Sequence, residues 1–298
     1  MNSNLKKGTF CSIASALVFG FTPVLASLTF QMGSNAMTLT FYRNGMAVPV
    51  LLAILLLRKI DLRISLKDFL TLAAISVVFS ATTTYILYDA YNYIGVGLST
   101  TLHFLYPMFT VFFGWVFFHK KLDKAKVFAL LLATAGVAMA TGEGGTFALK
   151  GILLAVASAV TYAGYLLGIE QTAIGKMDSM KSMFYMCIVN AAAVALFDLP
   201  FGTINYGLPP LTMFYTFLLA VLNSALAYVL LIVGIKLIGA GNAAIFSMLE
   251  PVGGVAAGVI FLSEELPLMK LLSCAVILCA VMIPIIRDRN SQEERLEA

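Results

Sequence analysis

Two charged side chains lie inside long apolar stretches of this sequence, where water cannot solvate them. Glu250 directly precedes Pro251 in the stretch 239–262, GAGNAAIFSMLEPVGGVAAGVIFL, and Arg43 lies in the stretch 36–57. A charge in hydrocarbon is costly, and ionisable residues within membrane segments therefore usually mark a substrate site, an ion pathway or a proton relay. These two residues are the first candidates for chemistry in the chain.

Glu250 is placed near the middle of a bilayer by its position in its stretch. It is about the tenth residue, so a rise of 1.5 Å per residue puts it roughly 14 Å deep in a core about 30 Å thick. A carboxyl group at that depth can serve to bind and release a proton during transport. The alternative is a carboxylate that only satisfies the backbone at the helix break caused by Pro251.

Arg43 lies roughly 10 Å from the outer surface by the same rise, within a few Å of the level of Glu250. Its guanidinium stays protonated, so it needs a partner or water. Three roles remain open for it. Arg43 binds a substrate carboxylate, holds Glu250 in its ionised form, or extends to the outer surface.

Polar residues at helical spacing add further candidates for a water-lined face. His103 shares one face of its stretch with Ser99, Tyr106 and Thr110. The other candidate binding residues are Tyr88, Tyr162, Asn223 and Asn242. For each of them the alternative is a hydrogen bond between packed helices, and for His103 it is a neutral, hydrogen-bonded core position.

The composition requires a membrane around the elements that carry these residues. Of the 298 residues, 60% are hydrophobic and 11% are charged, against about 25% charged in soluble domains. Ten apolar segments approach the roughly 20 residues that a transmembrane helix needs. The expected spans are 8–30, 36–57, 68–90, 96–118, 125–141, 150–170, 180–198, 211–235, 240–262 and 268–286.

The placement of lysine and arginine predicts how these spans are threaded. With the N-terminus in the cytoplasm, nearly all of the 19 Lys and Arg residues fall in cytoplasmic stretches, and only Lys150 and Lys270 fall in outer ones. Such an asymmetry follows the positive-inside rule, and a count of nine or eleven spans would destroy it. We therefore expect a multi-pass protein of the cell (inner) membrane with both termini in the cytoplasm.

The two halves of the chain repeat one another. A shift of 144 residues places Gly95 on Gly239 and Pro107 on Pro251, and a shift of 143 aligns the Ala-Ser-Ala stretches that open each half. Five spans per repeat is an odd number, so the second repeat enters the membrane from the opposite side. The prediction is an all-α polytopic membrane protein of ten transmembrane helices, built as two inverted-topology five-helix repeats, 1–142 and 143–298.

These features together resemble a ten-span member of the drug/metabolite transporter superfamily with two EamA-type repeats. The resemblance rests on the Ala-Ser-Ala openings, on Arg43 in the second span, and on the Gly-x-Gly entry and mid-span proline of spans 4 and 9. It implies a cavity lined by spans 1–4 and 6–9. The acidic turn that the family often has after span 4 is replaced here by Lys120-Lys121, whereas Glu264-Glu265 follow span 9.

The predicted function is secondary active transport of a small metabolite, with export of amino acids or related compounds in exchange for protons by alternating access. Glu250 is the predicted protonation site, and its twin position in the first repeat holds Tyr106. Two alternatives stay open: a carrier for organic or quaternary ammonium cations, and a passive channel or uniporter. The sequence has no HExxH, GxSxG or P-loop motif, so we do not expect an enzyme.

The expected partners follow from this function. They are a small-molecule substrate, the lipid bilayer and protons, with no nucleic acid and no cofactor, in a monomer or a homodimer. The four cysteines all lie in apolar runs, which favours buried thiols over a disulfide framework or a metal site.

Overall fold

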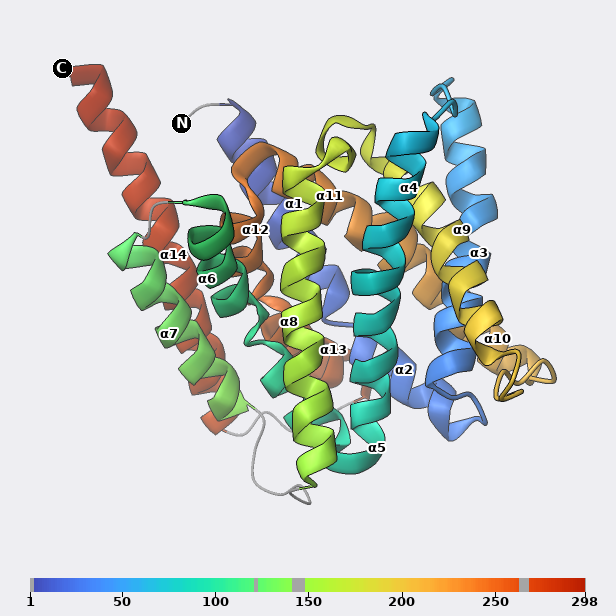
Figure 1. Cartoon of the computed structure of the whole chain (residues 1–298). Coiled ribbons are helices and arrows are strands. Elements are labelled where there is room, and N and C mark those ends of the chain that lie inside the picture. Colours follow the sequence, from blue (N-terminus) through green and yellow to red (C-terminus); the bar gives the residue numbers. More distant parts are fainter. Residues whose placement is uncertain (1–2, 121–122, 141–147, 263–267, 298) are drawn as a thin grey trace.

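The computed structural model describes residues 3–120, 123–140, 148–262 and 268–297, and within them every regular element is helical (Figure 1). The elements before residue 142 are α1 (Ser3–Phe19), α2 (Thr22–Gln31), α3 (Ala36–Leu57), α4 (Leu66–Ile75), η1 (Ser76–Ala81), α5 (Thr82–His103), α6 (Tyr106–Phe118) and α7 (Lys124–Ala140). Those after it are α8 (Leu149–Gln171), η2 (Ala173–Lys176), α9 (Ser179–Asp198), α10 (Pro210–Leu219), η3 (Ala220–Ala227), α11 (Tyr228–Ile238), α12 (Ala240–Ser247), α13 (Glu250–Leu262) and α14 (Leu268–Glu297).

The unbroken helices agree closely with the expected spans. Helices α3, α8 and α9 begin and end within one residue of the predicted segments. In the described part of the chain, six helical stretches are long and apolar enough to cross a membrane: Ser3–Gln31, Ala36–Leu57, Leu66–His103, Leu149–Gln171, Ser179–Asp198 and Pro210–Ile238. The segments Tyr106–Phe118 and Leu271–Ile283 are apolar but shorter.

Two helix breaks recur at equivalent places in the two halves, one where spans 4 and 9 begin and one inside each of these spans. Gly95 interrupts α5 with φ 73° and ψ 167°, and Gly239 before α12 has φ 82° and ψ 157°. Positive φ is open to glycine because it lacks a Cβ atom. A second break precedes α6, which begins at Tyr106, and α13, which begins at Glu250. Both pairs are 144 residues apart, so the two copies share the same helix breaks.

Proline accounts for the position of the second break. Each of the helices α6 and α13 has its proline, Pro107 or Pro251, at the second position. There the missing N–H would have had no partner within the helix, and the fixed φ suits the first turn. The same residue type starts α2, where Pro23 follows Thr22, so the expected first span is also divided.

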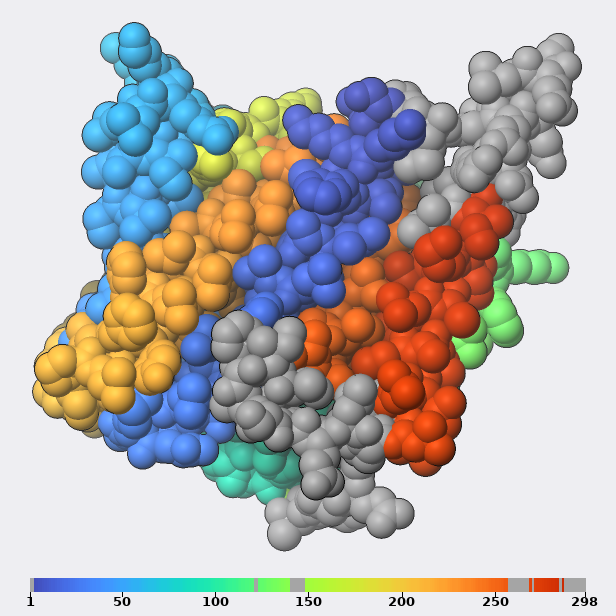
Figure 2. All heavy atoms as spheres, turned by 180° about the vertical axis from the view of Figure 1, so that it is seen from behind, coloured from blue at the N-terminus to red at the C-terminus, as the bar shows by residue number. Residues whose placement is uncertain are grey.

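The two halves of the chain are interleaved in space. The most extensive helix packing pairs α1 with α11, α3 with α9, α5 with α8, and α7 with α14. Each pair joins an element from before residue 142 with one from after it. The two termini lie at the same end of the bundle (Figure 1). In Figure 2, α1 lies across the molecule between α11 and α13, both of which it contacts.

Three sequence predictions fall outside the described residues. The expected boundary between the repeats, at 142/143, lies within 141–147. The acidic turn at Glu264-Glu265 lies within 263–267, and Lys121 lies within 121–122.

The break between α1 and α2 is held directly against the start of α13. A Cβ atom on Gly20 would lie 2.5 Å from the nitrogen of Gly254, 2.6 Å from the carbonyl carbon of Gly253 and 2.7 Å from the carbonyl oxygen of Glu250. All three are backbone atoms, which cannot rotate away as a side chain can. Glycine at position 20 therefore permits the two broken helices to meet.

Replacing Gly20 by alanine should destabilise the protein, because the new methyl group must push two backbones apart. We expect a loss of about 1–3 kcal/mol, as for overpacked cores. The matched control is Gly45→Ala on α3, where a Cβ atom would meet nothing within 4 Å and alanine favours a helix by up to about 1 kcal/mol. Unfolding midpoints in detergent compare the two variants, and equal midpoints would contradict the close contact.

Candidate functional site

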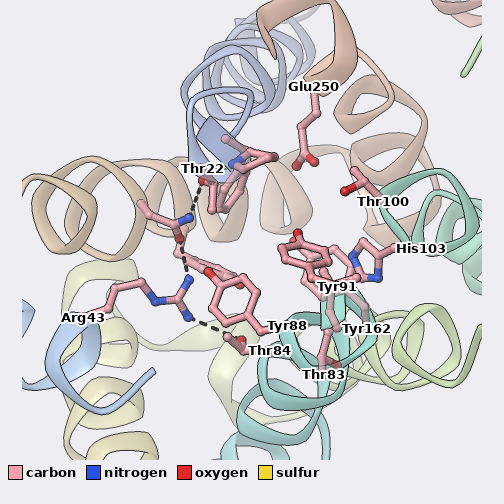
Figure 3. Close-up of a pocket in the computed structure, with 15 residues that line it drawn as sticks. Thr22, Arg43, Thr83, Thr84, Tyr88, Tyr91, Thr100, His103, Tyr162 and Glu250 are labelled. Carbon is pink, nitrogen blue, oxygen red and sulfur yellow. Dashed lines mark hydrogen bonds between the residues drawn. The ribbon is translucent and has the colours of Figure 1, made fainter. Parts of the chain in front are cut away.

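A buried cavity of about 80 Å³ lies where the helix breaks meet (Figure 3). It is bounded by the α1–α2 break, α3, α5, α8, η3, α11 and the first turn of α13. The polar residues that line it are Thr22, Arg43, Thr83, Thr84, Tyr88, Tyr91, Thr100, His103, Tyr162, Asn223, Tyr228 and Glu250. A polar cavity inside an apolar bundle is the usual form of a ligand site in membrane transporters.

Arg43 forms the positive side of this cavity. Its guanidinium donates to Asn223 Oδ1 at 3.3 Å and to Thr84 Oγ1 at 3.3 Å, and lies 5.9 Å from the ring centroid of Tyr228. The side chain is 4% exposed, and its Nε has no hydrogen-bond partner among the described residues. Asn223 in turn donates to Thr22 Oγ1 at 2.6 Å. Neutral oxygens thus fix the guanidinium in place without neutralising its charge.

The local backbone explains how Asn223 reaches Arg43. Asn223 lies in η3, a π-helical stretch in the middle of a long apolar helix. Such stretches interrupt the regular hydrogen-bond ladder, turn side chains out of the usual helical register and often occur at functional sites. The first half has a similar stretch, η1, which begins at Ser76, 144 residues before Ala220.

Glu250 forms the negative side of the cavity. It is the first residue of α13, where the helix dipole favours an anion. Figure 3 shows its carboxylate on the opposite side of the cavity from Arg43, with Thr100 nearby and with the rings of Tyr88 and Tyr91 along one wall. No hydrogen bond or ion pair to this carboxylate is found among the described residues.

The two charges share a cavity but do not pair with each other. Within the described residues the ion pair closer than 4.0 Å is that of Lys120 and Glu170, and neither of these residues lines this cavity. The structure therefore does not show the direct contact by which Arg43 would hold Glu250 in its ionised form. Each charge instead faces the cavity with space for a counter-charge.

His103 and the tyrosines form an aromatic wall beside the charges. The imidazole Nδ1 lies 2.8 Å from Ser158 Oγ, and its ring is 5.2 Å from that of Tyr162. Ser158 also donates to the carbonyl oxygen of Ala155 at 2.6 Å. Because the hydroxyl has one proton to donate, this bond leaves Nδ1 of a neutral imidazole as the donor to Ser158. His103 is thus a hydrogen-bonded residue of the cavity wall.

Similarity to known proteins shows to which family the chain with this cavity belongs. The model of the EamA-like transporter family matches residues 6–142 and again residues 149–285. The chain belongs to the EamA-like transporter family. It is therefore a membrane-embedded transporter, and the family match covers both halves that share the repeated helix breaks.

Relatives of this EamA-like transporter agree with that class. It is 24% identical to the uncharacterized transporter YcbK of Bacillus subtilis, over 90% of this chain and 89% of the relative. It is 27% identical to the uncharacterized transporter YvbV of the same organism, over 78% of this chain and 77% of the relative. A solved crystal structure superposes with a TM-score of 0.83 at 19% identity, over 98% of this chain and 99% of the other, which shows a shared fold.

The structure brings most of the candidate residues of this EamA-like transporter to one place. Those that line the cavity are Arg43, Tyr88, His103, Tyr162, Asn223 and Glu250. Tyr106 lies behind the wall: it is 0% exposed and packs edge-on against Tyr162 at 4.7 Å between ring centroids. Tyr106 therefore packs against the wall and does not line the cavity.

Asn242 lies elsewhere, and the expectation that it shares the site has to be corrected. It donates to the carbonyl oxygen of Ile238 at 2.8 Å and lines a separate cavity of about 160 Å³ that includes Lys120 and Glu170. The prediction treated the span as one helix, in which Asn242 and Glu250 share a face. The break between α12 and α13 removes that relationship.

Several lining residues of this EamA-like transporter were not singled out from the sequence. They include Thr22, Thr84, Tyr91 and Thr100. One available signal was Pro23, which interrupts an apolar run beside Thr22 as Pro251 does beside Glu250. The remaining threonines give little signal because a threonine in a helix usually bonds its own backbone, as Thr84 does to Ser80.

A metal site is not suggested by the side chains that the structure describes. No three of their His, Cys, Asp or Glu residues lie close enough to share an ion. The cavity is instead lined by the two charged side chains Arg43 and Glu250.

A double-mutant cycle tests this geometry. Arg43→Gln and Asn223→Ala remove two ends of one hydrogen bond, so their effects on the free energy of unfolding should be coupled by about 0.5–3 kcal/mol. Arg43→Gln and Glu250→Gln alter residues that share no hydrogen bond, so their coupling should be the smaller of the two. The geometry is wrong if the Arg43–Glu250 coupling is the larger of the two.

Proposed function

We propose that this transporter exports amino acids or related zwitterions in exchange for protons, by alternating access. The observation that carries the proposal is that Arg43 and Glu250 face one buried cavity from opposite sides without pairing. A molecule with a carboxylate and an ammonium group supplies the missing counter-charge to each. Hydrogen bonds to charged groups contribute about 1.5–3 kcal/mol each, enough for selective binding.

Proton coupling follows from competition for one carboxylate. Glu250 has no protein partner among the described residues, so its charge must be balanced by a proton or by the ammonium group of the substrate. One carboxylate cannot hold both. A cycle in which the proton displaces the substrate on one side of the membrane, and the substrate displaces the proton on the other, couples their movements.

The fold we propose for this cycle has ten spans in two inverted five-helix repeats. It is supported by the matched breaks at Gly95 and Gly239 and by the matched helix starts at Tyr106 and Glu250. Repeats of this kind surround sites formed by discontinuous helices, and alternating access exchanges their conformations. From the positive-inside distribution of Lys and Arg we infer a protein of the inner membrane with both termini in the cytoplasm.

The end of the bundle where both termini lie is the proposed cytoplasmic end. Side chains packed between this end and the cavity fit a conformation that is closed on the cytoplasmic side. Tyr162 stacks on Tyr165 at 5.7 Å between ring centroids, and Tyr165 meets Tyr228 edge-on at 5.9 Å. Beyond this aromatic layer, Lys120 at the end of α6 pairs with Glu170 at the end of α8, which joins the two halves of the chain. Opening toward the cytoplasm requires these contacts to separate.

A carrier for organic ammonium cations is the second candidate. Glu250 among Tyr88, Tyr91 and Tyr162 could hold an ammonium group by charge and by cation–π contact. Arg43 in the same cavity repels such a cation unless a carboxylate accompanies it. The two candidates therefore differ in whether the substrate needs a carboxylate.

Replacing Glu250 by glutamine tests the proton coupling. In proteoliposomes, an imposed pH gradient should no longer drive amino acid transport by Glu250→Gln, because the amide cannot exchange a proton. The control is Asp89→Asn, which removes a carboxylate of α5 that does not line the cavity and should keep the response. A pH-driven flux that survives Glu250→Gln excludes this residue as the coupling site.

Replacing Arg43 by glutamine tests the substrate class. Loss of a charged hydrogen bond should weaken binding of zwitterions about 10- to 100-fold, while amines without a carboxylate should bind no worse. Arg58→Gln, an exposed arginine at the end of α3, is the matched control. If the wild-type protein binds quaternary amines more tightly than any zwitterion, and Arg43→Gln changes neither, the cation carrier is the correct function.

A further inference from the structure

A second cavity adjoins the charged one, and we propose that it receives an apolar side chain of the substrate; this inference rests on the proposed function and narrows its substrate class. The adjoining cavity has a volume of about 310 Å³. It shares Phe19, Pro23, Thr100 and Glu250 with the charged cavity. Glu250 therefore lies at the junction, and a group bound to its carboxylate can extend into either space.

The walls of this second cavity are almost entirely apolar. Apart from the shared residues, its lining includes Val24, Val96, Phe104, Val137 and Val255. Two further lining residues, Gly97 and Gly254, have no side chain to fill the space. An apolar cavity of about 150 Å³ is already large enough to bind a benzene ring, so this one can hold a branched or aromatic side chain.

The volume of the charged cavity indicates that a substrate extends beyond it. The charged cavity, at about 80 Å³, is well below the roughly 300–1,000 Å³ of a small-molecule site. It has room for the charged groups of an amino acid but little more. The apolar cavity, at about 310 Å³, adds room for the side chain, while the carboxylate is held at Arg43 and the ammonium at Glu250.

The cavity that the repeat relates to this one does not have almost entirely apolar walls. The 144-residue shift relates Gly97 to Gly241, Gly254 to Thr110 and Val255 to Val111. These three counterparts, Gly241, Thr110 and Val111, all line one small cavity. That cavity has a volume of about 160 Å³ and also includes Lys120 and Glu170. Only one of the two related spaces therefore suits an apolar group.

A lipid acyl chain is the other occupant that such walls could accept. An acyl chain offers no group to Glu250, whereas the side chain of a zwitterion enters this cavity with its ammonium already at that carboxylate. The shared residues therefore favour the substrate. Binding that does not depend on the substrate's side chain would instead indicate a lipid.

Binding of free alanine and leucine to the purified protein tests the proposal. Burial of the added methylene and methyl groups should make leucine bind about 10- to 100-fold more tightly than alanine. In Val96→Phe and in Val255→Phe, where a ring fills the cavity, that ratio should fall toward one. The control Val77→Phe adds a ring at a position that is 41% exposed and lines a different cavity, so the ratio should stay as in wild type.

The outcomes separate this proposal from the function on which it rests. If alanine and leucine bind equally to wild type, or if the ratio survives in both filled variants, the apolar cavity is not a side-chain site, although zwitterion transport stands. If neither amino acid binds and no other zwitterion does, the proposed function fails and this inference fails with it. The wild-type ratio is decisive even if one filled variant does not fold.

Discussion

The buried guanidinium of Arg43, held by neutral oxygens and not by a carboxylate, is the constraint on which the rest of the site depends. Insertion of a charged residue at the centre of a membrane helix costs about 2.5–3.5 kcal/mol even when the surroundings adapt. Two hydrogen bonds of 3.3 Å, to Asn223 and Thr84, hold the guanidinium but bring no opposite charge to it. The arginine is thus anchored in position with its charge available, which suits the recognition of an anionic group.

Helix breaks make this arrangement possible. The break at Gly20 meets the start of α13, and the π-helical stretch η3 turns Asn223 toward Arg43. The repeated breaks at Gly95 and Gly239 belong to both halves of the chain, whereas Pro23 and Glu250 have no counterpart at the twin positions. The two unrepeated residues lie on the same cavity. A symmetric frame therefore carries an asymmetric site.

Much of this could be predicted from the sequence, because glycine, proline and hydropathy act locally. The bounds of α3, α8 and α9 and the breaks at Pro107 and Pro251 follow from such local signals. The rotation of one helix segment against the next does not, since it depends on packing between distant parts of the chain. For that reason the depth of Arg43 and Glu250 suggested that the two side chains are in contact, and the structure shows no such ion pair. A regular helix likewise suggested that Asn242 lies beside Glu250, whereas Asn242 lines a different cavity.

The most direct test of the account is a structure of the protein with a bound amino acid. We expect the carboxylate of the ligand at Arg43, its ammonium group at Glu250, and its side chain between Val96 and Val255. A ligand bound at another place, with Arg43 and Glu250 in a direct ion pair, would contradict it.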